Sequence, residues 1–364
     1  MQFDRPRPGG LLGVLARRWW LGAPVLVLVA LAAWLPGLAT MPPVDRDEAR
    51  YAQASKQMLE SDAYIDIRLQ DEPRHKKPVG IHWLQVAAAA TIGDGAASPI
   101  WVHRLPSLLG ALAAVLLTAA IGAAMVDRST GFLAGLAMAT SVILSVEAHL
   151  AKTDAVLLAF VLLAQWAFWQ IWSRRDDPGG SERWWAVFWI AQALAVLTKM
   201  PIAPAVSGLT ALILIAWERR IDWLARFRPL AGPLLFLVIA APWFVAVGVV
   251  TDGDFYRHAW GVDILGKLHE GQEGHGAPPG TYVPALFATA WPFAALVPLA
   301  VVWAWRRRHE DAPKFLIAWV VGFWVLMEAA VTKLPHYTLP TYPALAIAAA
   351  AAVLALDRRR PWLV

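Results

Sequence analysis

The chain has 364 residues, of which 58% are hydrophobic and only 16% are charged, and its mean hydropathy is +0.49. A soluble domain carries about 45–50% apolar and about 25% charged residues, so this composition excludes a soluble or disordered protein and predicts a polytopic membrane protein. The chain contains no cysteine, which excludes disulfides and thiolate metal sites. The net charge of +5 is interpreted as a signal of membrane topology, so no nucleic-acid partner is expected.

Ten nearly charge-free segments are candidates for transmembrane helices, because a spanning helix needs about 20 mostly apolar residues. They are residues 21–40, 100–126, 131–150, 155–172, 184–198, 201–217, 230–250, 281–305, 314–331 and 337–356. A further apolar run at 80–93 has 14 residues and fits an interfacial or re-entrant segment better. The sequence therefore predicts an all-α integral membrane protein of about ten transmembrane helices.

The basic residues set the expected orientation. If 80–93 does not cross and the N-terminus is cytoplasmic, every cluster of arginines falls on the cytoplasmic side. The clusters are Arg17/Arg18, Arg174/Arg175, Arg219/Arg220/Arg226/Arg228, Arg306/Arg307/Arg308 and Arg358/Arg359/Arg360. A crossing at 80–93 would turn every later cluster outward, against the positive-inside rule. We therefore expect both termini in the cytoplasm.

Two long polar stretches then face the outer side of the membrane. They are the first extracytoplasmic loop, 41–95, with interfacial helices, and the second extracytoplasmic loop, 251–280. The whole chain, 1–364, is treated as a single transmembrane domain around these loops, with no separate soluble domain. Functional chemistry is therefore expected at the outer boundary between membrane and water.

A helix is predicted near the start of the first loop. Asp45 followed three residues later by Glu48 indicates a capping box. The helix places Ala52, Ser55 and Leu59 on one small-to-apolar face, so we expect it to lie along the membrane surface.

The same helix carries a second, polar face. Asp47, Arg50 and Tyr51 stand at i, i+3 and i+4, which brings a carboxylate, a cation and a phenol together. Two interpretations of Asp47 stay open: it stabilises the helix start and pairs with Arg50, or its carboxylate is available for chemistry.

A basic cluster precedes the amphiphilic run at 80–93. Arg74, His75, Lys76 and Lys77 follow one another and end at Pro78. Cations on the outer face oppose the positive-inside trend, which favours an anion-binding role, and phosphate suits Lys and Arg donors. Snorkelling side chains or contacts with lipid headgroups are the alternative.

Other polar residues fall at the outer ends of later spans: Glu147, His149, Asp154, Lys333, His336 and Tyr337. Asp154 is either a helix N-cap or a carboxylate of a site, and Lys152 is a plausible salt-bridge partner. Lys333 with Tyr337 fits either an interfacial anchor pair or a site. Glu147 and His149 are interpreted as cavity-lining, because a carboxylate in the membrane is costly unless it is paired or hydrated.

Six stretches of the chain carry a family resemblance. They are DEARYAQASKQML, KKPVGIHWLQ, HRLPSLLGAL, AKTDAVLLAF, HGAPPGTYVPALFATAWPF and TKLPHYTLPTYPALAI. In this order they resemble the outer-face core of the lipid A aminoarabinose transferases, which belong with the protein mannosyltransferase-like GT-C glycosyltransferases. The resemblance implies a GT-C fold in the bacterial inner membrane. It also implies transfer of a sugar from a polyprenyl-phosphate donor to a lipid, glycan or protein acceptor on the extracytoplasmic face.

The resemblance also implies roles for individual residues. Asp47 matches the proposed base on the acceptor, and Asp154 matches a second family aspartate. The residues expected at the donor phosphate are Arg50, Lys77, Lys333 and Tyr337. The residues expected around the substrate cavity are Tyr51, Lys76, Glu147, His149 and His336.

One departure from the family concerns a metal ion. The aminoarabinose transferases typically carry a glutamate before the KP lysine, and it shares a metal site with a later histidine. Here that position is Lys76, while His275 matches the histidine. Because the Lys76 ammonium would repel a metal and supply its charge directly, we expect metal-independent transfer with no required cofactor. If a divalent metal is bound, His275 is the expected ligand, with His75 or Glu273 in place of the lost acid.

The competing function is a flippase or transporter of lipid-linked sugars. Such proteins tend to carry inverted repeats and polar groups near the bilayer midplane. Here the polar residues gather at one face of the membrane. This distribution favours an enzyme that meets its donor, its acceptor and the membrane lipids at one surface.

Overall fold

The protein is described here by a computed structural model that covers residues 10–177, 183–259 and 276–357. Helices make up nearly all regular structure in these ranges, and the one sheet found there is a short antiparallel hairpin. It pairs β1 (Arg68–Leu69) with β2 (Glu72–Pro73). The predicted all-α class is confirmed.

Within the described residues, five segments are long and apolar enough to cross a membrane, or six if a bent pair counts as one span. The five are α5 (Ile100–Met125), α8 (Asp154–Trp172), α11 (Ala231–Val250), α16 (Asp311–Ala329), and η6 (Pro335–Thr341) continued by α17 (Tyr342–Asp357). The bent pair is α6 (Arg128–Ala139) and α7 (Val142–Ala148), which meet at 62°. Shorter apolar helices are α2 (Trp19–Trp34), α9 (Trp184–Thr198), α10 (Ile202–Glu218), and η5 (Phe293–Leu296) with α15 (Val297–Arg306).

Proline and glycine explain why some apolar segments differ from the predicted bounds. α2 ends at Trp34 and not near residue 40, because Pro36 has no N–H to donate and Gly37 has a left-handed φ of +86°. The segment predicted at 281–305 is divided into α14 (Tyr282–Thr289), η5 and α15, and Pro292 lies at the break.

The centre of the bundle is built around α8. In the most apolar 18-residue stretch of α8, 78% of the residues are buried, whereas the corresponding share in α11 is 17%. α11 packs mainly on α9 and presents most of its side chains outward. α5 approaches α8 closely at Gly110, where a Cβ would meet the backbone of Val156 at 2.8 Å. The Ser107 hydroxyl of α5 donates to the Lys152 carbonyl at 3.0 Å, which fixes the chain just before α8 begins.

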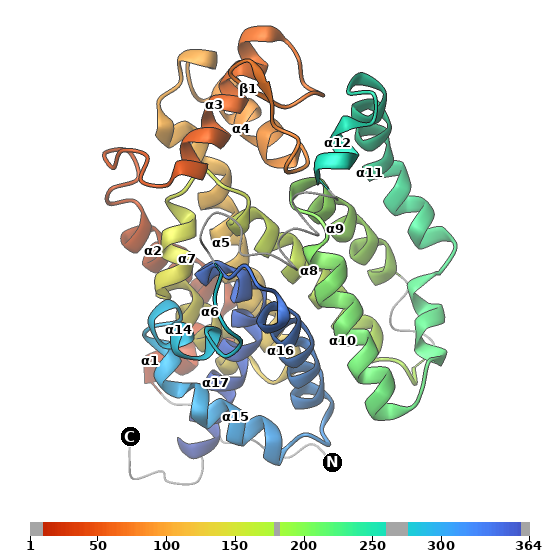
Figure 1. The fold of residues 1–364 in the computed structure, drawn as a ribbon. Coiled ribbons are helices and arrows are strands. Elements are labelled where there is room, and N and C mark those ends of the chain that lie inside the picture. The colour runs from red at the N-terminus through yellow and green to blue at the C-terminus, as the bar shows by residue number, and fades with distance from the viewer. Residues whose placement is uncertain (1–9, 178–182, 260–275, 358–364) are drawn as a thin grey trace.

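Polar segments gather at one end of the bundle (Figure 1). There α3 (Arg46–Ser61), the β1–β2 hairpin, α4 (Gly80–Thr91) and η1 (Gly95–Ala97) lie near α12 (Asp254–Tyr256), which follows α11. The other end carries α1 (Gly10–Arg17) and α15. A short η2 (Asp222–Phe227) packs on α8 and α9.

α3 begins as the sequence predicts, but it buries a different face. The Asp45 carboxylate accepts from the Asp47 N–H at 2.8 Å and caps the helix. The buried residues are Glu48, Tyr51, Ala54, Ser55 and Met58. Of the predicted row of Ala52, Ser55 and Leu59, only Ser55 is buried. The cause is Arg104 of α5, whose Nε lies 2.7 Å from Glu48 Oε1, with both side chains fully buried. A charged residue therefore turns inward because it finds a buried partner.

Candidate active site

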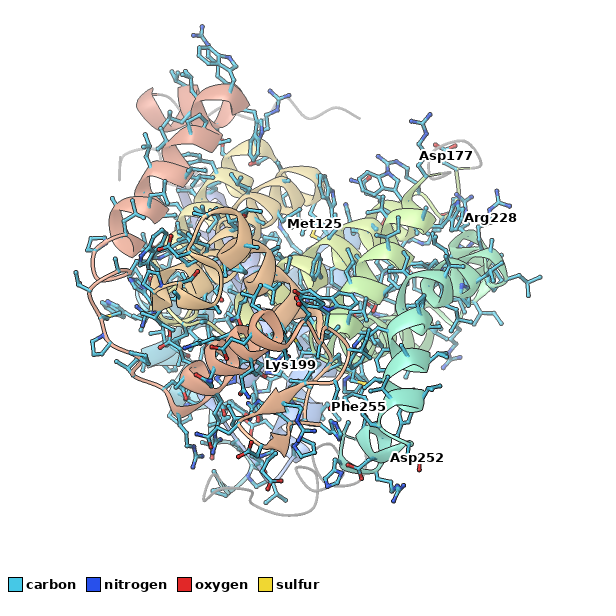
Figure 2. The ribbon with its side chains drawn as sticks, turned by 90° about the horizontal axis from the view of Figure 1, so that it is seen from above. Met125, Asp177, Lys199, Arg228, Asp252 and Phe255 are labelled. Atoms are coloured by element: carbon cyan, nitrogen blue, oxygen red, sulfur yellow. The ribbon has the colours of Figure 1, made fainter. Side chains whose placement is uncertain are left out.

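A cavity of about 290 Å³ lies between α8, α10, α16 and η6. Its walls are mostly apolar and include Leu157, Leu158, Ile202, Phe323 and Leu326. The ionisable side chains that line it are Lys77, Asp154, Lys199, His336 and Tyr337. Seen from above, Lys199 lies near the middle of the molecule, whereas Asp252 lies at the edge beyond α11 (Figure 2). An apolar space with a few ionic groups suits an amphiphilic ligand with a charged head.

Asp154 is the first residue of α8, and its side chain is only 7% exposed. Its Oδ1 lies 2.7 Å from Lys199 Nζ, and its Oδ2 accepts from the Thr153 hydroxyl at 3.2 Å. The N-cap interpretation is wrong, because the helix starts at Asp154 and the carboxylate turns to Lys199. The partner predicted for Asp154, Lys152, instead reaches Asp45 at 2.9 Å.

The Lys152–Asp45 pair joins the start of α3 to the start of α8. Burial alone would lower the pKa of Lys152, but the carboxylates of Glu147, Asp154 and Asp45 outweigh burial and raise that pKa above its usual range. Burial alone would likewise raise the pKa of Asp45, but the Asp47 N–H and Lys152 outweigh it and lower that pKa. Both groups therefore stay charged at neutral pH.

His336 connects two buried carboxylates. Its Nδ1 lies 3.6 Å from Glu147 Oε1, and its Nε2 lies 3.8 Å from Asp154 Oδ1. The other oxygen of Glu147 has no hydrogen-bond partner among the described residues. Glu147 and His336, both expected near a substrate cavity, thus lie beside Asp154, although only His336 lines the cavity itself.

Lys199 is a site residue that the sequence patterns did not single out. It follows α9 and lies over the Tyr337 ring, with Nζ 5.6 Å from the ring centroid. The available signal was its position: a lysine in the short link between two apolar segments, expected on the same side of the membrane as Asp154. Its ion pair with Asp154 joins residues 45 positions apart, which no local pattern reveals.

Asp47 lies on α3 and does not line the cavity. Its carboxylate is 45% exposed and pairs with Arg50 at 3.3 Å and with Arg74 at 3.8 Å. Tyr51 departs from the predicted polar face, since it is buried against Ile81 and Val156. Its ring also stacks on His82 at 5.3 Å. Asp47 and Arg50 therefore form an exposed ionic cluster with Arg74, while Tyr51 anchors the helix.

Three other predicted residues do not reach the cavity lining. The Lys333 ammonium donates to the Glu328 carbonyl at 2.9 Å and to the Ala330 carbonyl, which satisfies the end of α16. The ring nitrogens of His149 lie at the carbonyls of Ser145 and Pro36, at 2.7 and 3.1 Å. Lys76 is exposed beside Lys77.

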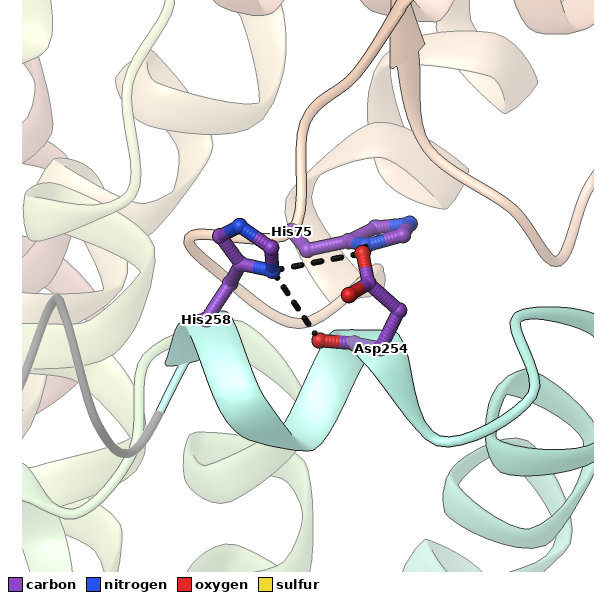
Figure 3. A group of neighbouring side chains, drawn as sticks. All are labelled: His75, Asp254 and His258. Carbon is purple, nitrogen blue, oxygen red and sulfur yellow. Dashed lines mark hydrogen bonds and ion pairs between the residues drawn. The ribbon is translucent and has the colours of Figure 1, made fainter.

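The expected metal ligand, His275, lies outside the described residues, as does Glu273. Among the described residues, one group of histidine and acidic side chains is close enough to hold a metal ion: His75, Asp254 and His258 (Figure 3). None of the three lines the cavity.

Comparisons with known proteins agree with the family resemblance found in the sequence. The family profile for dolichyl-phosphate-mannose-protein mannosyltransferase matches residues 76–245. An undecaprenyl phosphate-alpha-4-amino-4-deoxy-L-arabinose arabinosyl transferase of Erwinia tasmaniensis is 28% identical over 306 residues, covering 83% of this chain and 54% of the relative. The resemblance to the aminoarabinose transferases is confirmed. A relative of the same name from Enterobacter sp. is 27% identical over 331 residues, covering 90% of this chain and 57% of its own length. This chain thus spans a little over half the length of these aminoarabinose transferases.

Solved structures agree on the fold. The crystal structure of ArnT from Cupriavidus metallidurans bound to undecaprenyl phosphate superposes with a TM-score of 0.82 at 24% identity, covering 92% of this chain and 60% of ArnT. An oligosaccharyltransferase of Archaeoglobus fulgidus in the apo form superposes with a TM-score of 0.61 at 12% identity. The match covers 95% of this chain and 52% of the oligosaccharyltransferase. The chain has the helical membrane fold of the aminoarabinose transferases and is a multi-pass membrane protein.

Proposed function

We propose that this chain transfers a sugar from a polyprenyl-phosphate-linked donor to a lipid, glycan or protein acceptor at the extracytoplasmic face of the bacterial inner membrane. The observation that carries the proposal is the cavity, whose apolar walls also contain Lys77 and the Lys199–Asp154 pair. Apolar walls suit an isoprenoid chain, and ammonium groups suit a phosphate. The relatives are named for an undecaprenyl phosphate sugar, and the bound ArnT structure holds undecaprenyl phosphate.

The donor phosphate is assigned to Lys77 and Lys199, with the Tyr337 hydroxyl as a further donor. All three side chains line the cavity. As the bond from the sugar to the phosphate breaks, negative charge grows on the phosphate, and cations fixed in a site of low dielectric stabilise it. In this proposal the Lys333 ammonium donates to the Glu328 carbonyl at the end of α16, and the Arg50 guanidinium pairs with Asp47. Neither side chain is assigned to the donor phosphate.

The acceptor is assigned to Asp47, with Asp154 as the second carboxylate. The acceptor oxygen attacks the anomeric carbon, the bond to the phosphate oxygen breaks, and the acceptor proton passes to Asp47. The exposure of Asp47 makes it reachable from outside the cavity. Asp154 is held by Lys199 and His336, so we assign it to holding the sugar and the cations in place.

The membrane arrangement belongs to the same proposal: one domain, 1–364, with ten crossings and both termini cytoplasmic. The loop 41–95 then carries α3 and α4 as surface helices outside, and 251–280 forms the second outer loop. Each of the ten predicted segments contains a helix, and α3, α4 and α12 gather at one end of the bundle, which supports this arrangement. A reporter fused after Val364 is expected to be cytoplasmic, and a periplasmic signal would contradict the orientation.

We also propose that no metal ion sits on the donor phosphate. Lys76 stands where the family resemblance implies a glutamate, so that ligand is lost, and the Lys76 ammonium beside Lys77 repels a metal cation. Chelators are then expected to leave transfer unchanged. Loss of activity with EDTA, restored by Zn²⁺ or Mn²⁺, would contradict this assignment.

The test of the function is mass spectrometry of envelope lipids and glycans from cells with and without the gene. A glycan that loses one sugar when the gene is deleted supports transfer. If no glycan changes while a polyprenyl-linked sugar accumulates on the inner side, the protein is a flippase.

A further inference from the structure

Glu147 is a buried carboxylate that the proposed transfer reaction does not use. It lies on α7, its side chain is only 2% exposed, and its Oε2 atom has no hydrogen-bond partner among the described residues. Within the same part of the chain its one ion-pair partner is His336 of η6, whose Nδ1 lies 3.6 Å from Glu147 Oε1. An ionised carboxylate buried in this way is destabilising unless a cation neutralises it.

The ammonium groups beside Glu147 are already paired with other carboxylates. Lys152 Nζ lies 2.9 Å from Asp45 Oδ2. Lys199 Nζ lies 2.7 Å from Asp154 Oδ1. Three carboxylates thus face two ammonium groups at this place in the structure. One negative charge, that of Glu147, is left over, and a single proton cancels it.

His336 is placed to carry that proton to the cavity. Its Nδ1 faces Glu147, and its Nε2 lies 3.8 Å from Asp154 Oδ1 at the cavity wall. The His336 ring packs edge-on against Tyr337 at 5.1 Å, and Lys199 lies over the Tyr337 ring. The imidazole therefore borders two of the groups assigned to the donor phosphate. A neutral imidazole can accept a proton at one ring nitrogen while it donates one from the other.

We propose that Glu147 and His336 form a proton relay that protonates the leaving phosphate of the donor. The inference rests on the proposed transfer reaction and names its general acid. His336 is the catalytic residue, because it meets the phosphate in the cavity. Glu147 is a positioning residue that acts through His336: its O–H donates to Nδ1, which keeps the imidazole N–H at Nε2, toward the cavity.

The proton transfer accompanies departure of the phosphate. As the bond between the anomeric carbon and the phosphate oxygen breaks, Nε2 gives its proton to a phosphate oxygen, and Nδ1 takes the proton of Glu147. His336 stays neutral, Glu147 becomes ionised, and the acceptor proton passes to Asp47. A phosphate monoester has a second pKa of about 6, close to that of imidazole, so the transfer is nearly balanced in free energy. Water returns a proton to Glu147 after the polyprenyl phosphate has left.

The two distances at His336 agree with this role. Separations of 3.6 and 3.8 Å are longer than hydrogen bonds, and catalytic hydrogen bonds commonly reach their final length only in the substrate complex. Asp154 and Lys199 hold Nε2 beside the phosphate site, while burial of Glu147 keeps its proton from exchanging freely with solvent.

The test compares two donors in liposomes: a polyprenyl-phosphate sugar and its phosphorothioate, whose leaving group is a weaker base. His336→Gln is expected to lower turnover of the phosphate donor about 10²–10⁴-fold. Donor affinity should change little, since Lys77 and Lys199 remain. The phosphorothioate donor is expected to lose less, because its leaving group needs less help from an acid.

Glu147→Gln separates the relay from a structural role. The amide has the shape of the protonated acid and still orients the ring, but it has no proton to give. Turnover is expected to fall by a smaller factor than in His336→Gln, whereas the thermal unfolding midpoint should stay unchanged. His309, exposed in the turn after α15, is the control, and His309→Gln is expected to transfer sugar like the unmodified chain.

Three results would overturn the relay. One is normal turnover in His336→Gln or in Glu147→Gln. Another is a His336→Gln variant that slows both donors by the same factor, which would make His336 a support of the site only. The third is a Glu147→Gln variant whose unfolding midpoint falls in proportion to its activity. If the unmodified chain transfers sugar from neither donor, the proposed function is refuted as well, which distinguishes that failure from a failure of the relay alone.

Discussion

The two ionic clusters of the proposed site differ in their surroundings. At the start of α8, Asp154 and Lys199 form a pair at 2.7 Å that is almost wholly buried. On α3, Asp47 faces Arg50 and Arg74 at longer distances, and its side chain is 45% exposed. Buried charges interact strongly and hold a fixed geometry, whereas exposed pairs are screened and contribute little to stability. The buried cluster is therefore suited to hold an anionic donor, and the exposed one is suited to meet an acceptor that arrives from outside.

The largest expected effect comes from the exposed cluster. Asp47→Asn is expected to lower turnover about 10²–10⁴-fold, because the amide cannot take the acceptor proton. Folding and donor binding should change little, since Asp47 does not line the cavity. Initial rates of transfer and donor binding are the measurements. Asp45→Asn is the control: Asn keeps the helix cap but loses the ion pair with Lys152, so a smaller loss is expected. If the two variants exchange phenotypes, the base is wrongly assigned.

The second prediction compares a buried with an exposed arginine. Arg104→Ala leaves Glu48 charged and buried without its partner, and it is expected to cost about 3–5 kcal/mol in the free energy of unfolding. Arg50→Ala removes an exposed pair and is expected to cost about 0–1 kcal/mol. Denaturant unfolding in detergent measures both. Equal costs would show that α3 is not held by the Glu48–Arg104 pair.

The third prediction separates the lysines. Lys77→Ala is expected to weaken donor affinity about 10–100-fold, because a hydrogen bond to a charged group contributes about 1.5–3 kcal/mol. Lys333→Ala is expected to lower thermal stability more than donor affinity, since its ammonium serves the carbonyls of α16. Binding of a polyprenyl phosphate and thermal unfolding are measured in parallel. Lys56, exposed on α3, is the control, and Lys56→Ala should leave both quantities unchanged. If Lys333→Ala weakens donor affinity as much as Lys77→Ala does, Lys333 binds the donor phosphate and this prediction is wrong.

The fourth prediction concerns His82, whose ring lies beside that of Tyr51 on α3. Burial, aided by the Arg74 charge, lowers the pKa of His82 to about 3 in the folded chain, below the unfolded value of 6.5. The unfolded state therefore binds more protons between these values, so this stability contribution is present above pH 6.5 and is lost as pH falls toward 3. The unfolding midpoint measured against pH checks this. His82→Gln is expected to flatten the profile over that window, and an unchanged slope would contradict the burial of a neutral His82.

The sequence predicted the helical class and most segments, because long charge-free runs and clustered arginines are local signals. It also placed Lys77, Asp154, His336 and Tyr337 among site residues, and the structure finds all four around one cavity. The inward turn of Glu48 was missed because it depends on Arg104, 56 residues away. Lys199 was missed for the same reason, since its partner lies on another helix. Pairings between helices depend on packing, which local periodicity does not encode.

The most direct test of the central claim is transfer by the full chain reconstituted in liposomes with a polyprenyl-phosphate sugar and an envelope lipid extract. Mass spectrometry follows the donor and the acceptor lipids. The account predicts free polyprenyl phosphate together with an acceptor heavier by one sugar, and neither product with Asp47→Asn. Donor that crosses the liposome membrane with its sugar still attached, and with no change in any acceptor, would contradict it.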